Sequence, residues 1–582
     1  MEMGIFPVPH VSSGIAPELF SPHHIVGSAK TGVVPKKPHL KLYRLQSGVA
    51  LFFVFIVAKQ IMHYVIGSGP AGVACAKALL ARGAQVVMLD AGLELEPERA
   101  EIVRQLAASQ PAEWTAADRA LLRGAVKIGA AGLPTKLVFG SDYPYAATEE
   151  NIPRTEHGTG LCPSLALGGL SNAWGAAMLP HRDEDIADWP VKNAELEQHY
   201  RAVLAFTGLA AQRDDLEELF PLHCENPQGL QGSRQAELLL GNLQRHRTAL
   251  RNRGWWVGRA RVAVRAADTP RGAGCNRCGL CMSGCPYGCI YNAADTVREL
   301  RAQKNFSYQR DVIVTRLREN SGNVRVEGFH RRTREPLLFE ADRAYLAAGV
   351  VPTAQILLRS QDAYDQPLRL RDSQYFLFPI VMGRRTPDVR SEALYTLSQI
   401  FIELNRPDIS PHTVHLQIYT YSDLIGAAAQ KTLGVFKFLA PQLEDRLLIV
   451  QGFMHSNDSQ QIELKLQHEG ARDRLHAAVV PNPKARNVVN RVMREMLGQA
   501  RRLGGLVLPP MLQFEKPGRG YHSGGSLPMR AQPGKFESDV LGRPHGWSNV
   551  HVVDASVLPS IPGTTITFSV MANAHRIGWE TA

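Results

Sequence analysis

Residues 62–90 read as a strand, a glycine-rich turn, a helix and a second strand, and no other feature of the sequence restricts the fold as strongly. Residues 63–67 are nearly all apolar, as expected of a strand that is covered on both faces. A helical pattern follows over residues 73–83, and Gly83 ends it before the second strand at 84–90. This order predicts a β-α-β unit and therefore an α/β fold with a parallel, Rossmann-type sheet.

The turn GSGPAG has the spacing of a dinucleotide-binding fingerprint. Gly67 permits the sharp turn, Gly69 lets the backbone approach a pyrophosphate, and Gly72 lets helix and strand pack closely. Asp90 ends the second strand, where a ribose hydroxyl needs an acceptor. The motif does not separate NAD from FAD. The predicted cofactor-binding residues of this unit are Gly67, Ser68, Gly69, Pro70, Ala71, Gly72 and Asp90.

The far C-terminus carries a second set of motifs. The run HVVDASVLP at residues 551–559, the PGTT turn after it and the helical stretch TFSVMANAHRIG closely resemble the C-terminal signature of the glucose-methanol-choline (GMC) oxidoreductases. Three further stretches fit that family in the same order, namely GGLSNAWG at 168–175, LAAG at 346–349 and YHSGG at 521–525. The resemblance spans residue 62 to the C-terminus.

The resemblance implies an α/β, Rossmann-type FAD-binding domain interleaved with an α+β substrate domain that contains an antiparallel sheet. We expect the FAD-binding domain to combine residues 62–215, 290–365 and 525–582. Residues 216–289 would form an insertion with a cysteine cluster, and residues 366–524 the substrate-binding domain.

The family pattern also implies positions for the flavin. Asp554 would lie at its phosphate and ribityl region, Val312 near the adenine, and the 168–175 loop along the isoalloxazine. The further cofactor-binding residues that it predicts are Gly169, Ser171, Asn172, Trp174, Ala348, Ala555 and Thr565. The GGLSNAW form looks most like the pyranose-oxidising and bacterial sugar dehydrogenase branch. Ala173 stands where some members carry the histidine that binds flavin covalently, so the FAD should be non-covalent.

His522 matches the histidine that heads a Gly-rich segment in the family. Hydride transfer from an alcohol to flavin needs a base for the hydroxyl proton, and histidine suits that role. The family usually has a second His or Asn in the turn before the last helix, where this chain has Thr565. Threonine can hydrogen-bond a substrate oxygen but is no base near neutral pH. We therefore predict His522 and Thr565 as the catalytic pair, with the proton chemistry on His522.

Five of the eight cysteines lie within residues 275–289. Cys275, Cys278, Cys281 and Cys285 reproduce the spacing of a bacterial ferredoxin run, which predicts an iron-sulfur cluster. In two-cluster ferredoxins the fourth cysteine of such a run binds the other cluster, so the fourth ligand stays open. It could be Cys285, Cys289, Cys162 or Cys224, or a three-iron cluster could form. The alternative is a cysteine-containing loop without metal, packed near the flavin.

The leading hypothesis is an FAD-dependent dehydrogenase that oxidises a CH-OH group of a sugar or polyol and passes the electrons to an external acceptor or acceptor protein. Two alternatives stay open. One is an oxidase of the same family that returns the electrons to oxygen. The other is a flavin-binding electron-transfer or structural subunit with no substrate of its own, which Thr565 motivates.

The composition indicates which kinds of binding partner and which compartment to expect. The formal net charge of +11 is scattered along the chain, and no nucleic-acid-binding signature is present, which argues against a nucleic-acid partner. Cysteines so sparse argue against a secreted disulfide scaffold and favour the cytoplasm.

The first 61 residues lack clear periodicity apart from an apolar run at 48–58, which is shorter than the roughly 20 residues of a membrane span. It could be a weak membrane or partner-binding anchor, a buried strand or helix, or an upstream stretch that is not native. Met62 directly precedes a strand, which favours the last interpretation.

Overall fold

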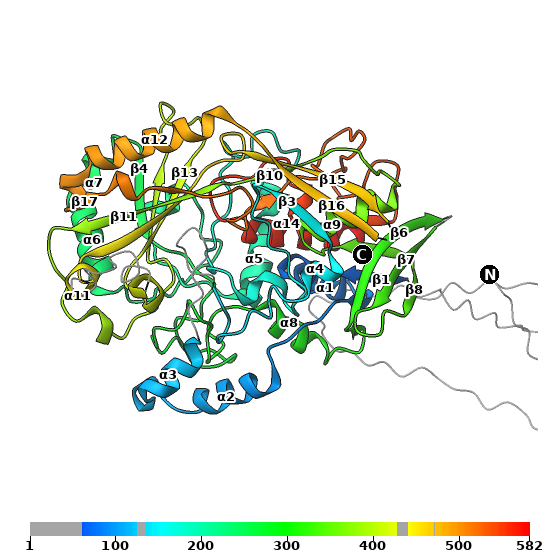
Figure 1. The fold of residues 1–582 in the computed structure, drawn as a ribbon, viewed down its shortest axis with the longest axis horizontal. Helices are drawn as coiled ribbons and strands as arrows, with labels where there is room; N and C mark the ends of the chain where they lie inside the picture. Colours follow the sequence, from blue (N-terminus) through cyan, green and yellow to red (C-terminus); the bar gives the residue numbers. More distant parts are fainter. Residues whose placement is uncertain (1–60, 125–135, 321, 428–439, 471) are drawn as a thin grey trace, which may run out of the picture. The chain divides into compact units, whose positions relative to one another are not determined.

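The structure is a computed structural model that describes residues 61–582 apart from 125–135, 321, 428–439 and 471 (Figure 1). The predicted N-terminal extension, with its apolar run, lies outside the described residues except for Ile61. The predicted β-α-β unit is confirmed as β1 (Met62–Ile66), α1 (Pro70–Ala81) and β2 (Gln85–Leu89), with β1 and β2 parallel. Gly83 has a φ of +81° just after α1, as expected of the residue that stops a helix.

A parallel five-stranded sheet surrounds this unit. Its strands follow the order β20-β9-β1-β2-β5, and every neighbouring pair is parallel. The other three strands are β5 (Phe306–Gln309), β9 (Arg343–Leu346) and β20 (Val550–Val552). The first and last strands of the described chain therefore share one sheet, joined through β9.

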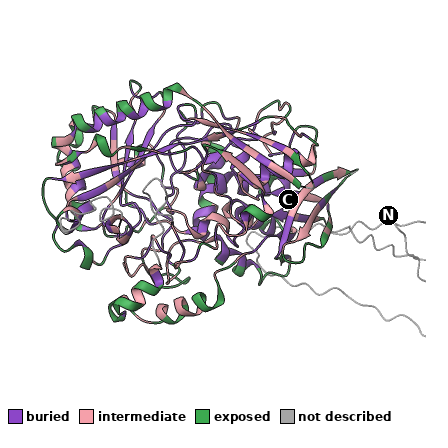
Figure 2. Ribbon diagram, viewed as in Figure 1, coloured by how far each residue is buried: buried purple, intermediate pink, exposed green. Residues whose placement is uncertain are grey.

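Helices cover this sheet. The C-terminal helix α14 (Thr567–Thr581) packs against α1 and against α5 (Asn193–Thr207). A Cβ at Gly578 would lie 2.8 Å from the carbonyl oxygen of Cys75, so α14 approaches α1 almost backbone to backbone. The remaining helices of this region are α8 (Ala293–Leu300) and α9 (Val350–Ser360). Figure 2 shows the buried residues concentrated in these helices and strands.

A three-stranded antiparallel sheet leads back to β9. It consists of β6 (Val312–Asn320), β7 (Asn323–His330) and β8 (Pro336–Ala341). The alternating apolar and polar residues between 311 and 348 are typical of such a sheet. It places Val312 at the edge of the parallel sheet, because the Val312 amide donates to the carbonyl oxygen of Asp90 (3.0 Å).

A large antiparallel sheet forms the second half of the fold. Its main path is β17-β11-β14-β13-β12-β4, with β18 also paired to β11. The strands are β4 (Trp255–Arg259), β11 (Tyr375–Met382), β12 (Ile400–Leu404), β13 (Val414–Tyr419), β14 (Leu447–Phe453), β17 (Gly505–Val507) and β18 (Gln513–Phe514). Helices α6 (Arg234–Arg245) and α12 (Pro483–Gly498) pack their apolar sides on one face of it.

A further five-stranded sheet follows the order β19-β10-β15-β16-β3. Its strands are β3 (Arg154–His157), β10 (Leu368–Asp372), β15 (Gln461–Glu469), β16 (Arg472–Val480) and β19 (Ser523–Gly524). Strands β3 and β4 lie outside the predicted substrate segment 366–524 yet pair with strands inside it. The sheets therefore interleave the chain more than the predicted segments do.

Shorter helices complete the described chain. They are α2 (Pro97–Ala107), α3 (Ala116–Arg123), α4 (Thr148–Asn151), α7 (Arg247–Arg251), α11 (Ala440–Glu444) and α13 (Ala500–Leu503). Helix α2 buries none of its residues, and Figure 2 shows it largely exposed. Trp114, between α2 and α3, stacks on Tyr287 of the cysteine loop with ring centroids 5.8 Å apart, so this pair of helices rests on that loop.

Candidate active site

The glycine turn has the geometry that the fingerprint predicts. Gly67 has a φ of +104°, and a Cβ there would lie 2.4 Å from the carbonyl oxygen of Ala347. A Cβ at Gly72 would lie 2.0 Å from the carbonyl oxygen of Gly67. A Cβ at Gly69 would meet nothing within 4 Å. Two glycines are therefore required by packing, while the third leaves open space at the N-terminus of α1, where unpaired amide groups attract an anion.

A cavity of about 310 Å³ opens beside this turn. Four of the predicted cofactor residues line it, namely Gly67, Asp90, Val312 and Ala348. They come from the ends of β1, β2 and β9 and from the start of β6, so three separate parts of the chain meet there. The volume is typical of a small-molecule site. The open space above Gly69 and this cavity together fit the phosphate and nucleoside part of a dinucleotide.

Asp90 is held at the cavity wall by two hydroxyl groups. Its Oδ2 accepts from Ser68 Oγ (2.7 Å) and from Tyr308 Oη (2.9 Å). Burial raises the pKa of Asp90 to about 6, although these hydrogen bonds act against burial. The carboxyl group is thus largely ionised at neutral pH and can still accept a hydrogen bond from a ribose hydroxyl.

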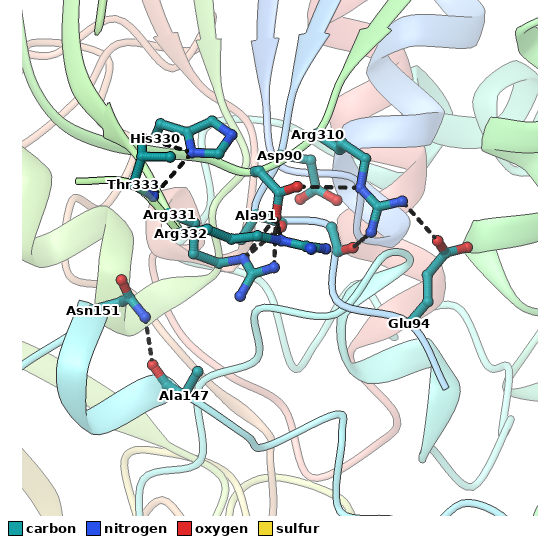
Figure 3. A network of polar contacts seen from close by, with 12 residues as sticks. Asp90, Ala91, Glu94, Ala147, Asn151, Arg310, His330, Arg331, Arg332 and Thr333 are labelled. Atoms are coloured by element: carbon teal, nitrogen blue, oxygen red, sulfur yellow. Dashed lines mark hydrogen bonds and ion pairs between the residues drawn. The ribbon is translucent and has the colours of Figure 1, made fainter. Parts of the chain in front are cut away.

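Arginines form a network of polar contacts beside Asp90 (Figure 3). Arg331 donates to the carbonyl oxygen of Ala91 (3.3 Å) and to Asp311 Oδ1 (2.5 Å). Arg310 pairs with Glu94, with 3.4 Å between their charged atoms. Burial raises the pKa of Asp311, but the hydrogen bonds and charge of Arg331 outweigh burial and lower it overall. These pairs fix the loop after β2 against the start of β6.

The 168–175 loop crosses the glycine turn. The Gly168 amide donates to Ser68 Oγ (2.9 Å), and a Cβ at Gly169 would lie 3.2 Å from the Gly69 Cα. Its polar side chains bond within the protein: Ser171 Oγ donates to the Gly168 carbonyl (2.6 Å), and Trp174 Nε1 donates to the Tyr291 carbonyl (3.0 Å). Asn172 Oδ1 accepts from Tyr143 Oη (2.7 Å). These hydrogen bonds within the protein fix the shape of the loop.

Asp554 joins the C-terminal segment to the helix after β9. Its carboxylate accepts from the Gly349 amide (3.0 Å), Thr353 Oγ1 (2.6 Å) and the Ser556 amide (2.9 Å). Burial raises the pKa of Asp554, with these hydrogen bonds opposing the rise. Asp554 therefore holds the N-terminus of α9 beside the glycine turn, and the buried Ala555 follows it.

His522 stands on the opposite side of the site, at the start of β19. Its ring stacks on Phe453 of β14 at 4.5 Å, and its Nδ1 is buried without a hydrogen-bond partner in the described structure. Tyr521 before it has a φ of +60°, an unfavourable conformation for a non-glycine residue, which fixes the direction of the His522 backbone. Burial, with a smaller contribution from the charge of His415, lowers the pKa of His522 to about 3.

The other predicted catalytic residue has a structural partner. Thr565 is buried, and its Oγ1 accepts from the Leu179 amide (3.0 Å). The turn before α14 is thereby docked on the segment that follows the 168–175 loop.

Three polar residues of this region carry no motif and were missed by the sequence reasoning. His415 and Glu403 form a fully buried pair between β13 and β12, with 2.6 Å between Nδ1 and Oε1. His181 is also buried, and its Nδ1 lies 3.1 Å from Thr564 Oγ1. The alternation of HTVHLQIYTY is the one signal that could have indicated a polar sheet face. Val414, Leu416 and Ile418 pack into the apolar core, which leaves His415, Gln417 and Tyr419 on the opposite face.

The cysteine loop brings its thiols around one cavity of about 10 Å³. The residues that line it include Cys275, Cys278, Cys281, Cys285 and Cys289. A hydrogen bond from the Cys289 thiol lowers the pKa of Cys285 to about 6 and raises that of Cys289. Burial raises the pKa of Cys278 and of Cys281 to about 12.

The arrangement of these thiols does not support the predicted iron-sulfur cluster. Within the described residues, no group of three or more His, Cys, Asp or Glu side chains is placed to hold a metal ion. Cys162 and Cys224 are not among the residues that line the cysteine cavity, so they contribute no thiol to it.

Comparisons with known proteins bear on the C-terminal part of the site. Residues 511–574 match the family model described as GMC oxidoreductase. This match covers the C-terminal segment alone, which we call the GMC segment. His522, Asp554, Ala555 and Thr565 all fall inside this GMC segment. No curated protein sequence matches the chain.

The fold is shared with a solved enzyme. The crystal structure of pyridoxine 4-oxidase from Mesorbium loti matches with a TM-score of 0.56 over 90% of this chain and 99% of that one, at 16% sequence identity. The match of the GMC segment supports an FAD-dependent oxidoreductase that acts on CH-OH groups, and the solved structure supports the fold. No helix in the described part of the chain is both long and apolar enough to cross a bilayer.

Proposed function

We propose that the enzyme oxidises a hydroxyl group of a sugar or polyol, with His522 as the base, and passes the electrons to an external acceptor. The observation that carries the proposal is the buried His522 with an unpaired Nδ1, inside the GMC oxidoreductase segment. FAD, when bound without a covalent link, supplies the acceptor for the hydride. We assign its binding to the glycine turn with Asp90, Val312 and Ala348, to the 168–175 loop, and to Asp554, Ala555 and Thr565.

A residue of the chain can take up the proton of the substrate hydroxyl. An imidazole with a pKa near 3 is neutral at physiological pH, so a ring nitrogen of His522 is free to accept the hydroxyl proton as the hydride leaves. The low pKa also means that His522 holds this proton only briefly and must pass it on. The stacking on Phe453 fixes the plane of the ring while this happens.

The oxidase alternative has one specific observation in its favour, since the solved enzyme that shares the fold is named an oxidase. Its name also adds pyridoxine, which has a primary alcohol, to the substrates to be tested. The subunit without its own substrate is not favoured by any observation. An iron-sulfur cluster at Cys275, Cys278, Cys281 and Cys285 rests on spacing alone, and we assign no electron-transfer step to it. We propose the cytoplasm as the location, because the cysteines are sparse.

The test is anaerobic purification with flavin and iron quantification. Sugars, polyols and pyridoxine are then screened with an artificial electron acceptor and, separately, under air with peroxide detection. We expect about one flavin per chain, turnover with an added acceptor and little peroxide. Peroxide release without an added acceptor would establish the oxidase instead. A colourless protein that takes up no added FAD would contradict the whole proposal. Iron bound to the protein would support the iron-sulfur cluster that the cysteine spacing predicts.

A further inference from the structure

A second unpaired imidazole lies close to His522. His181 is 1% exposed, and its Nε2 is buried without a hydrogen-bond partner in the described structure. Its ring packs edge-on against Trp189 at 5.4 Å. A buried polar atom with no partner is unfavourable, so His181 Nε2 is a candidate contact for a polar group of a substrate.

A chain of contacts links His181 to His522. Thr564, whose Oγ1 lies 3.1 Å from His181 Nδ1, directly follows Gly563. A Cβ at Gly563 would lie 2.9 Å from the carbonyl oxygen of Phe453, and the Phe453 ring stacks on His522. The turn at 563–565 therefore contacts His181 directly, and it contacts His522 through Phe453. Burial, and secondly the charge of His522, lowers the pKa of His181 to about 3.

We propose that His181 is a second catalytic residue, whose Nε2–H donates a hydrogen bond to the oxygen of the substrate hydroxyl while His522 removes the proton of that hydroxyl. This inference rests on the proposed function. When the alcohol is oxidised, the C–H bond breaks with both electrons leaving as hydride, the O–H proton passes to His522, and the C=O bond forms. His181 keeps its own proton throughout and stabilises the negative charge that develops on the oxygen.

The donor role fixes the tautomer of His181. The substrate hydroxyl has one proton, which goes to the base, so a second neutral imidazole at the same oxygen must donate. The proton of His181 is then on Nε2, and Nδ1 accepts from the Thr564 hydroxyl. The hydrogen bond at one ring nitrogen decides which nitrogen is protonated, which makes Thr564 a positioning residue.

The experiment uses the FAD-loaded full chain and four variants: His181→Leu, His181→Gln, Thr564→Val and, as the control, the exposed His545→Ala. Flavin reduction is followed anaerobically by stopped flow with D-glucose and with pyridoxine as probes. We expect His181→Leu to lower the maximal reduction rate by about 100-fold with the flavin content unchanged. His181→Gln, which keeps a donor, should stay within about tenfold of the wild type, and His545→Ala should match it.

The second measurement needs no substrate. In protein labelled with [15N]histidine, the resonances lost in His181→Gln identify the ring nitrogens of His181. We expect Nε2–H in the wild type and loss of this preference in Thr564→Val. An Nδ1–H tautomer or a charged ring at pH 7 would overturn the proposal, and so would wild-type flavin reduction by His181→Leu. If neither probe reduces the flavin, the failure belongs to the proposed substrate, and the tautomer still decides the role of His181.

Discussion

The polar groups of the candidate site show what single residues contribute. His522 combines a buried, unpaired Nδ1 with a pKa near 3, so it stays neutral over the whole physiological range. A neutral ring can accept a proton. Among the described residues of the GMC segment, only His522 has both an unpaired ring nitrogen and a ring stacked on Phe453 of β14.

Replacing His522 with Ala should lower kcat/KM by about 100- to 10,000-fold, the range typical of a lost general base. The flavin content should not change, because the ring stacks on Phe453 rather than on the glycine turn. Steady-state rates and the absorbance ratio of flavin to protein check both expectations, with His545→Ala as the exposed control. Turnover that survives His522→Ala unchanged would contradict the role of His522 as the base.

Asp90 gives a prediction about pH. Its pKa is about 6 in the folded chain against 3.8 as the reference value, so folding disfavours the ionised form. Below pH 4 the carboxyl group is mostly neutral in both the folded and the unfolded chain. As the pH rises from 4 to 6, the group ionises in the unfolded chain but not yet in the folded one, so the free energy of unfolding falls by roughly 3 kcal/mol. The apoprotein of Asp90→Asn should lack this loss.

Urea unfolding of the apoproteins at pH 4.5 and pH 7 measures the difference, with the exposed Glu98→Gln as the matched control. Stability that changes with pH equally in the wild type and in Asp90→Asn would contradict the assignment. FAD affinity of Asp90→Asn should fall, because the ribose loses a charged acceptor.

The residue scale also shows where sequence reasoning stops. The positions of Gly67, Gly69, Gly72 and Asp90 follow from a local motif, and the structure brings them together at one cavity and one helix end. His181 could not be found in this way. Its partner Thr564 is 383 positions away, and a lone histidine in a loop has no pattern that predicts such a contact.

At the scale of elements, the turn between β1 and α1 contains one glycine that we expect folding to require, Gly72, and one that we expect cofactor binding to require, Gly69. Gly72→Ala places a Cβ 2.0 Å from a carbonyl oxygen, whereas Gly69→Ala places one in open space at a φ of −65° that alanine tolerates. We expect Gly72→Ala to lower both the Tm and the flavin content. Gly69→Ala should keep the Tm of the apoprotein and lose flavin, because its methyl group occupies the approach to the phosphates.

Differential scanning fluorimetry of the apoproteins and flavin content after FAD loading test this pair. Equal flavin retention by Gly69→Ala and the wild type would show that the phosphates do not approach this residue. Gly241→Ala, at a half-buried position of α6 where a Cβ also meets nothing within 4 Å, is the control for a harmless methyl group.

Local elements were predictable from periodicity and their pairing was not. The helices α5, α8, α12 and α14 and the β6–β8 sheet follow apolar patterns in the sequence. In contrast, β4 joins the large sheet by pairing with β12, and β3 joins the sheet of β10, β15 and β16 by pairing parallel with β16. A strand of four or five residues carries no local information about so distant a partner.

For the whole molecule, the interleaved sheets predict cooperative unfolding. Strands β3 and β4 of the N-terminal half pair with strands of the second half in two different sheets, and β20 closes the parallel sheet from the far end of the chain. We expect guanidinium unfolding transitions followed by flavin fluorescence and by far-UV circular dichroism to coincide. Release of flavin well before the loss of secondary structure would show that the parallel sheet and its helices unfold as a separate unit.

The internal hydrogen bonds of the 168–175 loop have a consequence for cofactor uptake. Since Ser171, Asn172 and Trp174 are already bonded to the protein, the loop is preorganised before any flavin arrives. Association then requires little additional ordering of this segment, so its entropic penalty is small. The apoprotein should accordingly regain its cofactor at a rate limited by encounter rather than by rearrangement of the loop.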